Sequence, residues 1–121
     1  MPRHELTRVS GQGKGNVLVT LTAEDKPALA AQVEVQVNNM LPNSTFTVAR
    51  RLGLPPLDGS CASTDWQPVG SITTSEGGAG AHHFEVHRKE QFISGFEFDI
   101  KFRVEGNGTE LQTDCFRLKV K

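Results

Sequence analysis

The side chains best suited to chemistry lie in one short segment, Ala81-His82-His83-Phe84-Glu85-Val86-His87. Phe84 and Val86 alternate with polar residues, as apolar side chains do when they face a core. Successive side chains of a strand point to opposite faces, so His83, Glu85 and His87 would share the outer face. Two imidazoles and a carboxylate are ligands that zinc, iron or copper accepts. These three residues are the candidate metal ligands, and a divalent metal is the one candidate cofactor.

An ordinary exposed strand would also place polar residues at those positions, and this reading stays open. A metal site further needs supporting hydrogen bonds and usually a ligand from another strand. His82 has the inward parity but begins the strand, so we expect it at the rim. No Gly-x-Ser-x-Gly elbow is present, and residues 11–15 lack phosphate-loop spacing. We therefore predict no catalytic residue.

The two cysteines, Cys61 and Cys115, lie in a polar loop and in the last expected strand. The absence of Cys-x-x-Cys spacing excludes a zinc ribbon or a thioredoxin-like site. We predict a disulfide between them, closing a loop of about 54 residues and contributing up to about 4 kcal/mol. Two reduced thiols are the alternative. A disulfide would indicate an exported protein.

Length, charge and hydropathy limit the class of protein. A chain of 121 residues fits one domain over residues 1–121. With 13 basic and 14 acidic residues and no long basic run, nucleic acid is not an expected partner. No apolar run reaches the roughly 20 residues that span a bilayer. The start lacks an apolar leader, so the chain is either cytoplasmic or begins after a removed leader. With the disulfide, we predict an extracellular or periplasmic location.

The clearest strand of the fold that positions the candidate ligands and cysteines is predicted over residues 96–105. Residues 96–105 alternate strictly between apolar and charged side chains: Phe96, Phe98, Ile100, Phe102 and Val104 against Glu97, Asp99, Lys101, Arg103 and Glu105. This period of two indicates a strand with one face in the core and one face in solvent. It is typical of an antiparallel sheet.

Turn residues divide the rest of the chain into further short strands. We predict an all-β fold, a two-sheet antiparallel sandwich of seven to eight strands with Ig-like or Greek-key connections, and a barrel as the alternative. A bulge or twist is expected near Asp114-Cys115. The long irregular stretch 52–65 and the glycine-rich loop 75–80 are the expected contact surfaces. Trp66, the sole tryptophan, is expected in the core.

Three segments carry a resemblance to a known group of domains: Gly15-Asn16-Val17-Leu18-Val19-Thr20-Leu21, Val33-Glu34-Val35-Gln36-Val37 and Leu41-Pro42-Asn43-Ser44-Thr45-Phe46-Thr47-Val48. About a third of the chain thus resembles exported bacterial β-sandwich domains of the Ig-like and chordin-like (CHRD) type. Those domains commonly carry a His-x-His strand after the Pro-Asn turn, where this chain has residues 46–49 without histidine. The resemblance implies an exported, non-enzymatic domain and transfers no metal role.

Together these features predict an exported β-sandwich that acts as a non-enzymatic binding or structural module. Its partner would be a protein or cell-surface ligand of unknown identity, and the chain would be a monomer or an edge-paired homodimer. The alternative function is a metal-binding protein or metal-dependent enzyme that uses His83, Glu85 and His87.

Overall fold

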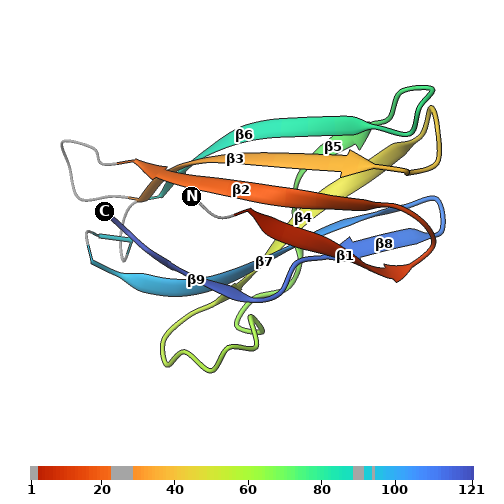
Figure 1. The fold of residues 1–121 in the computed structure, drawn as a ribbon. Helices are drawn as coiled ribbons and strands as arrows, with labels where there is room; N and C mark the ends of the chain where they lie inside the picture. Colours follow the sequence, from red (N-terminus) through yellow and green to blue (C-terminus); the bar gives the residue numbers. More distant parts are fainter. Residues whose placement is uncertain (1–2, 23–28, 89–91, 94) are drawn as a thin grey trace.

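The computed structural model describes residues 3–22, 29–88, 92–93 and 95–121 (Figure 1). Within these ranges the chain forms β-strands and no helix. No helix long and apolar enough to cross a membrane occurs there. The nine strands are β1 (His4–Ser10), β2 (Lys14–Thr22), β3 (Leu29–Asn38), β4 (Thr45–Gly53), β5 (Gln67–Thr73), β6 (Gly80–Arg88), β7 (Glu97–Gly106), β8 (Thr109–Gln112) and β9 (Phe116–Lys119).

All strand pairs are antiparallel, in the order β5-β4-β7-β8-β1-β2-β3-β6, and β9 pairs with β7 beside β8. The predicted all-β antiparallel class is confirmed. The predicted two-sheet sandwich with seven to eight strands in total is not confirmed, because nine strands form one continuous sheet. This sheet curls into two layers until β5 approaches β6, which makes the fold nearly barrel-shaped (Figure 1).

β1 joins the two layers. Its first half pairs with β2, where Leu6 lies opposite Gly15, and its second half pairs with β8, where Thr7 lies opposite Gln112. The register shifts between Arg8 and Ser10. Such an irregularity increases the local twist, which lets one strand leave one layer and enter the other. Hydrophobic periodicity in the sequence indicates which side chains face the core. It does not indicate that β1 pairs first with β2 and then with β8.

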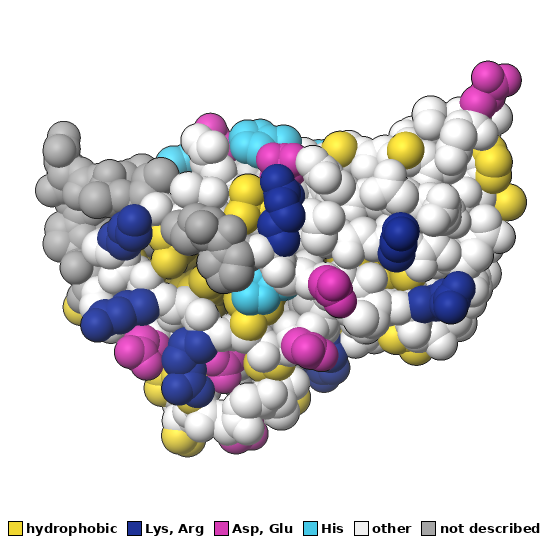
Figure 2. Space-filling model, viewed as in Figure 1, with side chains coloured by type: hydrophobic (Ala, Val, Ile, Leu, Met, Phe, Trp, Pro, Cys, Tyr) yellow, Lys and Arg dark blue, Asp and Glu magenta, His cyan; other side chains and the backbone are white. Residues whose placement is uncertain are grey.

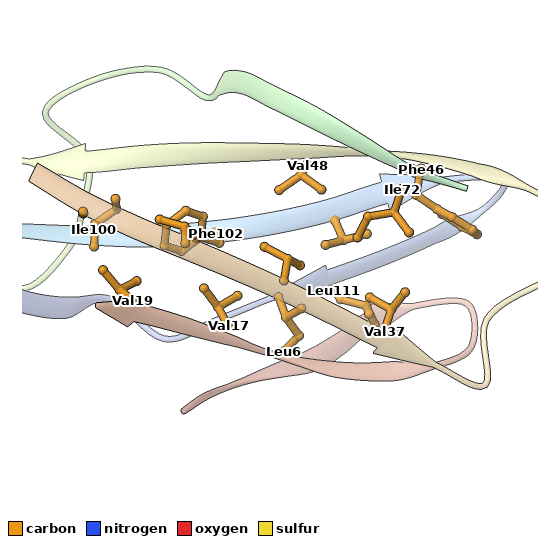
Figure 3. Close-up of a cluster of buried hydrophobic side chains, with 14 of the residues drawn as sticks. Leu6, Val17, Val19, Val37, Phe46, Val48, Ile72, Ile100, Phe102 and Leu111 are labelled. Carbon is orange, nitrogen blue, oxygen red and sulfur yellow. The ribbon is translucent and has the colours of Figure 1, made fainter. Parts of the chain in front are cut away.

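The core lies between the layers and contains the inward side chains of β7. Phe98, Ile100, Phe102 and Val104 are buried there, as the alternation predicted. Figure 3 shows Ile100 and Phe102 pointing toward the valines of β2, among other buried side chains. Burial of each such side chain contributes about 1.5–3 kcal/mol before chain entropy is considered.

The outer face of β7 departs from expectation at Asp99. This residue was expected in solvent with its charged neighbours, but it is only 3% exposed. Arg117, its partner on β9, donates a 3.0 Å hydrogen bond from Nε to Oδ1. The backbone of Cys61 lies over the β4–β7 pair, close enough that a Cβ at Gly53 would be 3.2 Å from the Cys61 Cα. The expectation was wrong because the loop after β4 covers this face.

The predicted disulfide between Cys61 and Cys115 is confirmed. It ties the loop of residues 54–66 to the chain between β8 and β9. The same loop is hydrogen-bonded to the end of β4, since Ser63 donates its N–H to the Leu52 carbonyl at 2.9 Å. The predicted irregularity near Asp114-Cys115 is also present, as the interruption between β8 and β9. The loop is therefore held to the sheet both covalently and by backbone hydrogen bonds.

Candidate functional site

The three candidate metal ligands lie on β6 as the alternation predicted. His83, Glu85 and His87 are exposed on the outer face, and Phe84 and Val86 pack against the core. His87 Nε2 is 3.5 Å from Glu85 Oε2, with the two side chains 60% and 57% exposed. Figure 2 shows histidine and acidic side chains together along the upper edge of the molecule, over β6. Two of the three candidates are thus already in contact.

The neighbouring strand adds few ligands to this face. On β3, Glu34 lies opposite His83 and Gln32 lies opposite Glu85. The Glu34 carboxylate accepts a hydrogen bond from the Gln36 amide. Among the described side chains, no three of His, Cys, Asp or Glu gather closely enough to hold a metal ion. The metal site of His83, Glu85 and His87 stays a prediction.

His82 lies at the junction of the two layers. Its ring faces Gly70 of β5 so closely that a Cβ on that glycine would be 2.1 Å from His82 Nε2. The ring also stacks on Phe84, with centroids 5.5 Å apart. A larger residue at position 70 would displace the imidazole. His82 therefore fills space between β5 and β6, a packing role.

A second cluster, which was not predicted, lies on the outer face of β4 and β7. We call Arg51, Trp66, Lys101 and Arg103 the basic–aromatic patch. The Arg103 guanidinium carbon is 4.6 Å from the Trp66 ring centroid, and Arg51 and Lys101 place their cationic groups 5.9 Å from it. The expectation that Trp66 belongs to the core was wrong, because its half-buried ring lies outside the hydrophobic cluster.

Strand register explains how this patch forms. Arg51 of β4 lies directly opposite Lys101 of β7, and Ala49 lies opposite Arg103, all with outward parity. Ala49 is only 2% exposed, which indicates that its larger neighbours cover it. Trp66 ends the disulfide-bonded loop immediately before β5. Its position therefore depends on tertiary contacts of that loop, although the alternation at 97–105 could have located Lys101 and Arg103.

Polar contacts hold the two arginines of the patch in place and leave some of their donors available. Arg51 donates a 2.9 Å hydrogen bond from Nε to the Thr64 carbonyl. Arg103 forms an ion pair with Glu105, at 3.2 Å. A guanidinium has five N–H donors, so both arginines retain capacity for a ligand. Three cations against the Glu105 carboxylate give the patch a positive excess in a chain of net charge −1.

Ionisation is altered at a few places. Burial lowers the pKa of His4, an effect partly offset by the charge of Asp114. The imidazole stacks on Phe116 with ring centroids 3.5 Å apart. The hydrogen bond and charge of Asp99 raise the pKa of Arg117. Neither group lies in the patch or on the outer face of β6. The shift at His4 reflects burial, and the shift at Arg117 reflects its pairing with Asp99.

The interior offers little room for a small molecule. An apolar cavity of about 30 Å³ lies between the layers, lined by residues that include Phe84, Phe98 and Phe102. That volume holds about one water molecule, and ligand pockets are usually about 300–1,000 Å³. This cavity is therefore too small for such a ligand, and the candidate sites described above lie on the surface. A larger open groove, of about 730 Å³, lies beside β1 and β2.

A comparison of the chain with known protein families and with curated protein sequences finds no match.

Proposed function

We propose that this protein is an exported, non-enzymatic binding module, built as an Ig-like sandwich of the kind its sequence resembles. Its binding surface is the basic–aromatic patch, and its ligand is an acidic polysaccharide. The observation that carries the proposal is the placement of the only tryptophan among three cationic side chains on an outer sheet face.

The chemistry of the patch matches such a ligand. Aromatic rings offer apolar faces to sugar rings, and tryptophan is enriched at binding surfaces. Guanidinium groups donate paired hydrogen bonds to carboxylate and sulfate oxygens, and a lysine adds a compact positive charge. Arg51, Lys101 and Arg103 supply these cations around one ring.

The disulfide supports a binding role because it holds the segment that ends in Trp66. A preorganised surface loses less conformational entropy when its ligand binds. Cys61 is fully buried, and the loop also accepts the Arg51 hydrogen bond through Thr64. A disulfide also persists in oxidising compartments, which supports export.

Fluorescence of Trp66 tests the proposal directly, because the chain has no tyrosine and no second tryptophan. Titration with dextran sulfate is expected to change the emission saturably, and neutral dextran is expected to leave it unchanged. Arg51→Ala and Lys101→Ala should each weaken the apparent affinity by about tenfold, since a hydrogen bond to a charged group contributes about 1.5 kcal/mol. Lys14→Ala, which removes an exposed cation from β2, is the matched control. Equal responses to both dextrans, or unchanged affinity in both patch variants, would contradict the proposal.

Metal binding by the outer face of β6 is the second candidate function. It is favoured by the contact between His87 and Glu85 and by the shared exposure of His83. These side chains offer nitrogen and oxygen ligands of the type that zinc accepts. Equilibrium dialysis of the wild-type chain against Zn²⁺, compared with the His83→Ala variant, tests this candidate. Equal zinc retention by the two proteins would contradict it.

A further inference from the structure

We propose that Zn²⁺ joins two copies of this chain through their β6 strands, each ion being held by Glu85 and His87 of one copy and His83 of the other. This inference rests on the second candidate function and is independent of the basic–aromatic patch. It completes a ligand set that one chain cannot bring together, because the missing ligand comes from the second copy.

The spacing within one chain works against a shared ion. His83 and His87 are four residues apart, which places their Cα atoms about 13 Å apart at the usual strand rise. Zinc binds each imidazole nitrogen at only about 2.1 Å. Glu85 and His87 can reach one ion, as their 3.5 Å contact indicates. His83 would have to lean along the strand by several ångströms to join them.

A second copy removes this difficulty because the segment His83-Phe84-Glu85-Val86-His87 is a palindrome of ligand and apolar residues. In an antiparallel pair centred on Glu85, His83 of each copy lies directly opposite His87 of the other. Side chains directly opposite in such a pair have Cβ atoms about 4.5–5.5 Å apart. The two-fold axis then generates two equivalent sites, each with two imidazoles and a carboxylate.

β6 is available for this pairing. It ends the strand order, and within the described residues no strand forms a ladder with its outer edge. β5 approaches it near His82, which packs against Gly70, and then diverges (Figure 1). The segment 83–87 lies beyond that contact. Pairing two copies there would join the β1-β2-β3-β6 layers into one sheet across the dimer.

The same geometry makes the pairing depend on metal. Centring on Glu85 places the two Glu85 carboxylates opposite each other, and like charges so placed are destabilising. Only about five residues per copy would pair, so few backbone hydrogen bonds would form to offset this repulsion. Zn²⁺ neutralises the carboxylates and links the copies, so we expect a monomer without metal and a dimer with it.

Mass measured by light scattering tests the inference. Addition of Zn²⁺ at one ion per chain is expected to double the 13.2 kDa mass of the monomer, and a chelator is expected to reverse the change. His83→Ala and His87→Ala should each remain monomeric with Zn²⁺. Glu85→Gln should weaken dimerisation, and Glu76→Gln in the β5–β6 loop, an equivalent charge change on an exposed residue, should leave it unchanged.

Mixing the two histidine variants separates sites between chains from sites within one chain. A heterodimer of His83→Ala and His87→Ala retains one complete site, formed by His87 of the first chain and His83 of the second. We expect the mixture to recover Zn²⁺-dependent dimers, with half the zinc per chain of the wild-type dimer. If the mixture remains as monomeric with Zn²⁺ as each variant alone, the inference is overturned.

A measurement of zinc uptake distinguishes failure of the metal-binding function from failure of the proposed joining of two copies. If the wild-type chain retains no Zn²⁺ in dialysis, the metal function itself fails and this inference falls with it. If the chain retains zinc at one ion per chain while its mass stays at 13.2 kDa, metal binding stands and the joining of two copies is overturned.

Discussion

The outer faces of β7 and β6 carry similar alternating polar residues and have different environments. On β7, Asp99 is buried beside the disulfide-bonded loop, and Lys101 and Arg103 surround Trp66. On β6, Glu85 and His87 remain exposed. The comparison shows that alternation determines which side of a sheet a residue faces, whereas connecting loops determine whether that side meets water.

The largest expected effect concerns the core beneath both faces. Phe102→Ala should lower the free energy of unfolding by about 3–5 kcal/mol, because it removes a fully buried ring and leaves a cavity. Urea titration followed by circular dichroism measures this. A loss below about 1 kcal/mol would show that the two layers do not pack around this residue.

Loss of the disulfide should act on the covered face. Combined Cys61→Ser and Cys115→Ser substitutions are expected to cost about 2–4 kcal/mol, since they release the constraint on the unfolded chain. They should also shift Trp66 emission to longer wavelength as the loop loosens and water reaches the ring. Without the disulfide, the outer face of β7 is expected to become more exposed to solvent, as the outer face of β6 already is. Unchanged emission would mean that the patch forms without the covalent link.

Paired carboxylate substitutions compare the two faces directly. Asp99→Ala should cost about 1–3 kcal/mol, because the buried carboxylate accepts a hydrogen bond from Arg117. Glu85→Ala should change stability by no more than about 0.5 kcal/mol, since it is an exposed surface substitution. Equal midpoints of unfolding in urea for the two variants would contradict the difference between the loop-covered face of β7 and the exposed face of β6.

The smallest effect should come from His4. Burial lowers its pKa in the folded chain, so the unfolded chain binds its proton more readily. The contribution of His4 to the free energy of unfolding is therefore fully present above the unfolded pKa of about 6.5. It is lost as the pH decreases through the lower pKa of the folded chain. His4→Leu should flatten this part of the profile of melting temperature against pH. An unchanged slope in the variant would assign the pH dependence to other groups.

Local pattern predicted much of what positions the candidate metal ligands. The facing of Phe84 and Val86 follows from the period of two, as does the burial of Phe98 and Phe102. The two cysteines could be paired because the chain has no others. These features depend on strand geometry and residue counts, which the sequence carries directly.

The basic–aromatic patch and the burial of Asp99 could not be read from that pattern. Both depend on where residues 54–66 lie, and a loop path is set by contacts with strands distant in sequence. The cations on β7 were visible as alternating charges, but Trp66 looked like a core residue because large aromatic residues usually are. The choice between a two-sheet sandwich and a barrel stayed open for a related reason, since the single continuous sheet depends on β1 changing partners.

That change of partner by β1 also has a kinetic consequence. Thr7 near the start of the chain pairs with Gln112, 105 residues later, and donates its hydroxyl to the carbonyl of that residue. Ladders between such distant segments require a large loop to close first, which slows folding. During synthesis β1 must wait for β8, so β1 can join the two layers only after the segment up to Gln112 has emerged from the ribosome.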